Sequence, residues 1–256
     1  MHADHTLEVA GASVRIIESE EGLEATWLTI SDGEVDITSA DDGLNATNGT
    51  EDSPESTGEA PAEEQPPQGA PAPEGAPEAG PAGGPPNEGG PGGGMDADDG
   101  SELVISGGTV VIDAEGDGID SNGSLTIAGG EVTVFGTQTG GDGAFDANGD
   151  FTIEGGTVIA LSAGQMEEVP AGEGQAWFAA AAAGGQGTAV EFTAGQEELA
   201  SITAVKGFGW AFYSGPWVTE GNTYSVSADG NARSAVAGET TGTPGRGERP
   251  AQVGTN

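Results

Sequence analysis

The feature that most constrains the fold of this chain is a repeat of twenty-odd residues. In the copy that runs from Ser101 to Gly123, two short runs of alternating apolar residues flank a glycine pair, and an acidic, glycine-bearing turn closes the unit. Repeats of this length indicate stacked units rather than a single globular core. The other copies begin at Leu7, Leu28, Leu125 and Phe151.

The spacing within each copy predicts β-strands. Apolar residues alternate with a period of two, and no segment has the 3.6-residue apolar periodicity of a helix. The glycine pair at the corner, Gly107-Gly108 in the copy above, permits the positive φ that a tight bend requires. We therefore predict an all-β fold, a right-handed parallel β-helix of about five coils, whose hand follows from the general preference of parallel crossovers.

Composition divides the chain into segments. Residues 1–50 and 101–166 carry the coils, whereas residues 51–100 consist largely of Pro, Gly, Glu and Ala and predict a disordered insertion. Residues 167–229 contain short alternating runs, at 188–193, 201–205, 210–213 and 223–227, which predict a small antiparallel β cap over the last coil. Residues 230–256 are rich in Gly, Thr and Arg and predict a disordered tail.

The charge of the chain limits its partners. With 43 acidic and 5 basic side chains, the formal net charge is −38, so we expect no binding to nucleic acid and no direct binding to an anionic membrane. The chain has no cysteine, which excludes disulfides and thiolate metal sites. Because its first residues match the middle of a coil and not a signal peptide, we expect an N-terminally truncated sequence of a secreted or cell-surface protein.

Stacked coils would bring their acidic turns into one column. Carboxylates about 5 Å apart repel one another, so a column of them favours a bound cation. Hard oxygen ligands without His or Cys are those that Ca²⁺ prefers. We therefore predict Ca²⁺ ions that bridge adjacent coils, although Asp-Gly and Asn-Gly pairs that serve only as turn residues would explain any single copy. The candidate ligands are Glu21, Glu24, Asp41, Asp42, Asn45, Asp117, Asp120, Asp142 and Asp146.

Five segments carry a resemblance to a known family: D-D-G-L-N-A at 41–46, G-D-G-I-D-S-N-G-S-L-T-I at 116–127, T-G-G-D-G-A-F-D at 139–146, F-T-I-E-G-G-T-V-I-A-L-S-A-G-Q-M at 151–166, and S-G-P-W-V-T-E-G-N-T-Y-S-V at 214–226. They resemble secreted bacterial carbohydrate-binding proteins with a polysaccharide-lyase-like right-handed β-helix. That family binds cellulose and acidic sugars such as pectin fragments and contains Ca²⁺. Its usual additional N-terminal coils are missing here.

The resemblance implies an extracellular carbohydrate-binding module for plant-type polysaccharides, either cellulose or acidic sugars such as polygalacturonate. Because the chain is so acidic, Ca²⁺ would have to bridge sugar carboxylates to protein carboxylates. Strand alternation points Trp27 outward, where it could stack on a sugar ring. For the cap tryptophans, which include Trp177, packing over the last coil is the alternative, and for Lys206 it is a surface ion pair. The candidate sugar contacts are Trp27, Lys206, Trp210 and Trp217.

Two other functions stay open. A pectate-type polysaccharide lyase would need a Lys or Arg as base beside the metal, and Arg15 is the one such residue on a coil. A cell-surface structural domain would use Ca²⁺ for stability alone. We expect a non-enzymatic binding protein with no catalytic residues. We expect a monomer, although exposed coil ends leave end-to-end pairing open.

Overall fold

The computed structural model describes residues 1–49 and 97–239, which belong to one compact unit. Nearly all of the expected insertion, and residues 240–256 of the expected tail, lie outside the described residues. The described ranges contain no helix, and so none that is long and apolar enough to cross a membrane.

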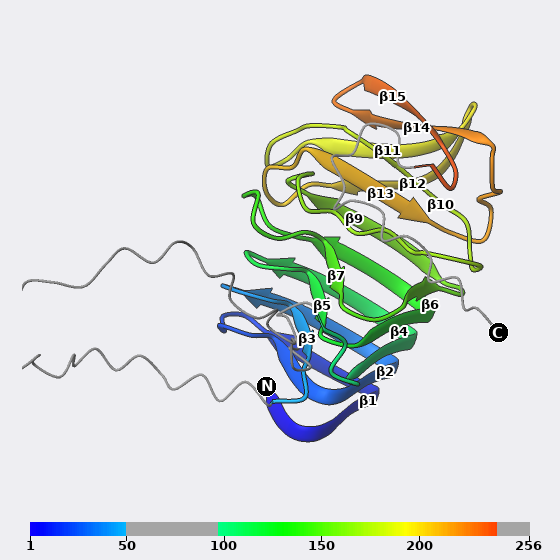
Figure 1. Cartoon of the computed structure of the whole chain (residues 1–256). Helices are drawn as coiled ribbons and strands as arrows, with labels where there is room; N and C mark the ends of the chain where they lie inside the picture. Colours follow the sequence, from blue (N-terminus) through cyan, green and yellow to red (C-terminus); the bar gives the residue numbers. More distant parts are fainter. Residues whose placement is uncertain (50–96, 240–256) are drawn as a thin grey trace, which may run out of the picture. The chain divides into compact units, whose positions relative to one another are not determined.

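Stacked parallel strands form a β-solenoid of about five turns, as the repeat predicts (Figure 1). The long strands stack in the order β1 (His2–Ile16), β2 (Leu23–Ser39), β4 (Glu102–Ala114), β6 (Ser124–Phe135) and β9 (Thr157–Ser162). Three short strands stack beside them, β3 (Leu44–Ala46), β5 (Ile119–Ser121) and β7 (Phe145–Ala147), and β8 (Phe151–Ile153) pairs with β6.

The core of the solenoid consists of inward side chains in register from coil to coil. Leu28 pairs with Leu103, Leu103 with Leu125, and Leu125 with Phe151, so that each apolar side chain covers its equivalent in the next coil. All four are buried. Because successive residues of a strand point to opposite faces, this register also fixes the outward side chains in columns.

Two sets of glycines shape each coil for different reasons. At the corners, φ lies between +82° and +108°, a conformation that favours glycine, at Gly11, Gly33, Gly108, Gly130 and Gly156. At the acidic turn, space is the constraint, because a Cβ on Gly118 would lie within 3.0 Å of the Val134 side chain. The same clash would occur between Gly43 and Ile112. The turn glycine therefore lets one coil approach the β-branched core residue of the next.

Antiparallel strands cover one end of the solenoid, as expected for the cap. β13 (Trp210–Ser214) pairs antiparallel with β9, and β10 (Trp177–Ala180) pairs with β13. Trp210 and Phe212 of β13 face the solenoid core, where the Phe212 ring lies 5.7 Å from that of Phe145. Ala211 and Tyr213 face a second apolar cluster. That cluster includes residues of the four-stranded sheet β12 (Glu197–Thr203), β11 (Ala189–Ala194), β14 (Thr223–Ala228) and β15 (Asn231–Val236).

Two details of the cap differ from the sequence prediction. The strand at 210–213 belongs to the solenoid sheet, and β10 was not expected. The predicted start of the tail at residue 230 is too early in the sequence. The chain continues into β15, which pairs with β14 across a turn at Asp229 and Gly230, both with positive φ. An Asp-Gly pair between alternating runs is a strong hairpin signal. The sequence analysis did not identify this hairpin, because the Gly-rich and Arg-containing composition of the region is typical of a disordered tail.

Candidate carboxylate site

The outward residues in the middle of the short strands form the predicted column. Glu24 of β2 pairs with Asn45 of β3, Asn45 with Asp120 of β5, and Asp120 with Asp146 of β7. Their neighbours on each strand point inward and are buried, which holds the column in place. The expected register of this acidic position is therefore confirmed. We call these four residues the strand column.

A second column runs through the acidic turns. Glu21, Asp42 and Asp117 each precede the turn glycine, and those glycines are in register. The last coil breaks this column, because Gly143 and not Asp142 lies in line with Asp117, as the bond from Gly118 N to Gly143 O shows. The expected alignment of Asp142 is wrong by one residue, since the longer turn before β7 adds a residue ahead of the strand. We call Glu21, Asp42 and Asp117 the turn column.

Carboxylates of these turns accept hydrogen bonds from the backbone of the neighbouring coil. Asp117 N donates to Asp42 Oδ1 over 2.8 Å, and Gly143 N donates to Asp117 Oδ1 over 2.6 Å. Glu167 continues the pattern beyond the last coil, where Ala144 N donates to its Oε2 over 3.1 Å. The acidic residues therefore satisfy backbone donors at the turns as well as concentrating negative charge.

Burial, and then repulsion between neighbouring carboxylates, raises the pKa values of four residues in the two columns. Burial, followed by the nearby charges of Asp42 and Asp146, raises the pKa of Asp120 to about 8. Burial is also the largest cause at the turn column, where it raises the pKa of Asp117 to about 8, of Asp42 to about 6 and of Glu21 to about 7. Several of these carboxyls therefore carry protons near neutral pH when no cation is bound.

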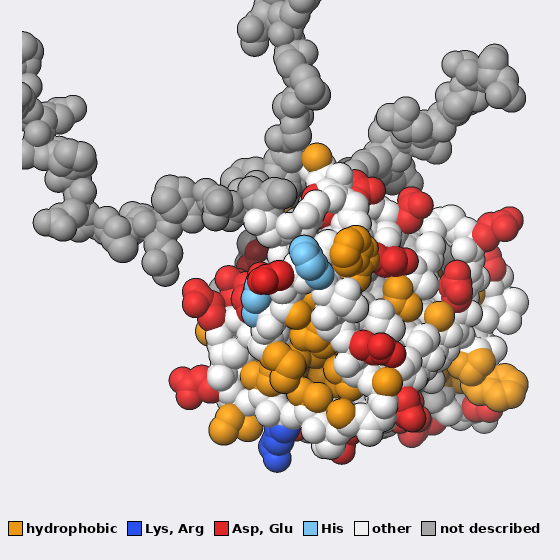
Figure 2. Space-filling view, turned by 90° about the horizontal axis from the view of Figure 1, so that it is seen from below, with side chains coloured by type: hydrophobic (Ala, Val, Ile, Leu, Met, Phe, Trp, Pro, Cys, Tyr) orange, Lys and Arg blue, Asp and Glu red, His pale blue; other side chains and the backbone are white. Residues whose placement is uncertain are grey.

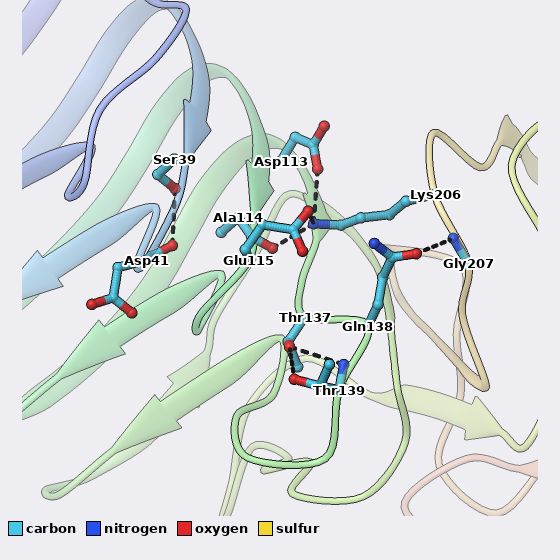
Figure 3. A network of polar contacts seen from close by, with 10 residues as sticks. All are labelled: Ser39, Asp41, Asp113, Ala114, Glu115, Thr137, Gln138, Thr139, Lys206 and Gly207. Carbon is cyan, nitrogen blue, oxygen red and sulfur yellow. Dashed lines mark hydrogen bonds and ion pairs between the residues drawn. The ribbon is translucent and has the colours of Figure 1, made fainter.

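Lys206 and Arg15 pair with carboxylates outside the two columns. Lys206 binds Asp113 over 2.8 Å and Glu115 over 3.4 Å, and it also donates to Ala114 O (Figure 3). Arg15 pairs with Asp36 over 3.2 Å. Within the strand column, Glu24 has an ion-pair partner, because His2 Nδ1 lies 2.8 Å from its Oε2.

The donor chemistry of the columns fits a hard cation. Asn45 Oδ1 is buried and lacks a hydrogen-bond partner within the described residues, between the carboxylates of Glu24 and Asp120 in its column. An unsatisfied buried oxygen beside carboxylates matches the ligands of Ca²⁺. Across residues 1–49 and 97–239, however, no three His, Asp or Glu side chains are already arranged to hold a metal ion. The side chains would have to turn toward a shared ion.

The remaining candidate ligands lie at the margins. Asp41 is exposed next to the turn column, and Ser39 Oγ donates to its backbone carbonyl (Figure 3). Asp142 is half-buried, with its pKa raised by burial and then by Asp41 and Asp146.

The candidate sugar contacts divide into exposed and buried groups. Trp27 is 47% exposed and Trp217 is 76% exposed, so the outward placement of Trp27 is confirmed. Trp210 and Trp177 are buried in the end of the solenoid core, so Trp210 is withdrawn as a sugar contact. Lys206 is withdrawn too, because its side chain is 9% exposed and is held by two carboxylates of the solenoid.

Sequence reasoning missed two carboxylates at the covered end. Glu167 is buried and accepts hydrogen bonds from Ser162 Oγ, Gly164 N and Ala144 N. Glu168 accepts one from Ala147 N over 2.7 Å. Both follow the last repeat and precede no turn glycine, so the spacing that identified the other acids did not extend to them.

Comparison of the chain with protein-family models, with curated proteins and with solved structures found no match.

Proposed function

We propose that this protein is an extracellular, calcium-dependent carbohydrate-binding module whose site is the pair of carboxylate columns. The observation that supports it is the concentration of Asp42, Asp117, Asp120 and Asp146 in register on adjacent coils, where burial and mutual repulsion raise the pKa values of the first three. A divalent cation would remove that repulsion and displace the protons.

In this proposal the ion is held between coils. Asp120 and Asp146 would bind it from the strand column, with Asn45 Oδ1 as a neutral ligand, and Asp42 and Asp117 would support it from the turn column. Bound Ca²⁺ would supply the positive charge that lets an acidic sugar approach a chain of net charge −38.

Exposed tryptophans supply the second element of the proposed sugar site. Trp27 lies three positions beyond Glu24 on β2, outward-facing and close to the strand column in sequence. An exposed indole offers a flat apolar face for a sugar ring. Trp217 is a separate candidate on the loop that follows β13.

The test is a calorimetric titration of the metal-free chain with Ca²⁺, followed by oligogalacturonate. We expect Ca²⁺ to bind with release of protons near pH 7, and the sugar to bind only afterwards. Asp120→Asn should weaken Ca²⁺ binding, while Asp150→Asn, at an exposed residue outside both columns, should leave it unchanged. Equal binding by both variants would exclude the columns as the metal site.

Trp27→Ala separates the sugar contact from the metal site. It should weaken oligogalacturonate binding and leave the Ca²⁺ titration unchanged, because the indole is not among the proposed ligands. Unaltered sugar affinity in this variant would remove Trp27 from the proposal.

A structural role for Ca²⁺ is the second candidate. The bonds from Asp117 N to Asp42 and from Gly143 N to Asp117 favour it, because they link successive coils directly. A large fall in melting temperature on chelation, without binding to any polysaccharide in an affinity gel, would support this function over the first.

A further inference from the structure

A separate feature lies at the end of the solenoid opposite the cap. Within residues 1–49 and 97–239, β1 pairs with β2 alone, so its other edge has no strand partner among these residues. Figure 2 looks onto this end and shows hydrophobic side chains gathered in the middle of the face. Leu7 and Val9 are 8% and 4% exposed there, whereas their partners Leu28 and Ile30 on β2 are fully buried.

The sequence of β1 is chemically symmetric about the bond between Gly11 and Ala12. Counted outward from this bond in either direction, the order is two small residues, an apolar residue, a charged residue and a second apolar residue. The segment before the bond is L-E-V-A-G, and the segment after it is A-S-V-R-I. Inward and outward positions follow the same symmetry, because Leu7 and Val9 point inward on one arm, and Val14 and Ile16 contact the same core from the other.

From this symmetry we propose that two copies of the chain pair end to end through antiparallel β1 strands. A two-fold axis through the corner at Gly11 and Ala12 would place each arm of one β1 over the opposite arm of the other. In that register, Val9 of one copy lies opposite Val14 of the other, and Leu7 lies opposite Ile16. Directly opposite residues of an antiparallel pair point to the same face, so the apolar residues stay inside.

Charge supports a second copy as the occupant of this edge. The same register brings Glu8 of one copy opposite Arg15 of the other, and the two-fold axis repeats the pair. The Arg15 side chain is 74% exposed and contacts Asp36 through Nε, so the rest of its guanidinium can reach a second carboxylate. β1 also carries His2 and His5, which makes this face less acidic than the chain as a whole.

Sedimentation equilibrium of the full chain at near-physiological salt tests the pairing. The wild type should form a dimer. Glu8→Arg and Arg15→Glu should each raise the dimer dissociation constant about tenfold, because each variant places like charges opposite one another twice. The double variant should restore the wild-type constant, since it re-creates both pairs with their signs exchanged.

Controls exclude general effects of charge and folding. Arg233→Glu changes the charge equally on β15 and should not alter dimerisation. Circular dichroism melts establish that each variant is folded. A wild type that stays monomeric at every concentration, or a double variant as weak as the single ones, would overturn the proposal. A monomer with a protected β1 edge in hydrogen exchange would assign the edge to another segment of the chain and equally overturn it.

Discussion

Along β3, β5 and β7, inward and outward side chains repeat in the same register but differ in what they contact. The inward column, Leu44, Ile119 and Phe145, is buried and each member covers the next. The outward column places Asn45, Asp120 and Asp146 at the same spacing, where two carboxylates repel one another. One register therefore stabilises the interior and concentrates charge on the surface, because apolar contacts improve with proximity and like charges do not.

The same contrast holds on the long strands, where inward positions should be more sensitive to substitution than outward ones. Ile112 lies in register between Ile37 and Val134, fully buried, so Ile112→Ala should lower the free energy of unfolding by about 2–5 kcal/mol. Val104→Ala, at an outward position of the same strand, is the matched control and should cost about 1 kcal/mol or less. Chemical denaturation of both variants measures the difference, and equal losses would contradict the inward packing.

The repeat was enough to predict the architecture, because inward Leu and Ile residues recur at positions that only a stacked β-solenoid can bury together. The strand column followed from the same spacing. The position of Asp142 did not, since spacing in sequence cannot tell how many inserted residues loop out before β7. The sequence left two roles open for Trp210 and for Lys206, and the structure favours packing for Trp210 and an ion pair for Lys206 over sugar contacts. Spacing could not decide between these roles, because they depend on how the cap strands meet the solenoid, a long-range contact without a repeat.

The carboxylates of the strand column and the turn column should make the metal-free protein less stable as pH rises. Asp117 and Asp120 have folded-state pKa values of about 8, against 3.8 for an unperturbed Asp, so the folded chain holds protons that the unfolded chain has lost. Their stabilising contribution is complete below pH 3.8 and disappears as pH rises to about 8. His2 acts in the same direction, because its pKa is also raised, first by its hydrogen bond to Glu24.

Thermal melts with a chelator between about pH 5 and pH 8.5 check this dependence. The melting temperature should fall by several degrees across the interval. Millimolar Ca²⁺ should reduce or reverse the fall, because the ion binds the ionised carboxylates of the folded chain. A metal-free melting temperature that rises with pH over this range would contradict the raised pKa values.

The smallest expected effect comes from removing one charge from the strand column. Asp120→Asn removes a carboxylate that raises the pKa of Asp117, and the register already accepts an amide there, since Asn45 occupies the equivalent position on β3. The new amide can donate to neighbouring carboxylates, so the metal-free chain should gain roughly 1 kcal/mol at pH 8. The gain should vanish near pH 5, where Asp120 is protonated in the folded wild type. Denaturation of Asp120→Asn and the Asp150→Asn control at both pH values would separate relief of repulsion, which depends on pH, from a gain in packing, which does not.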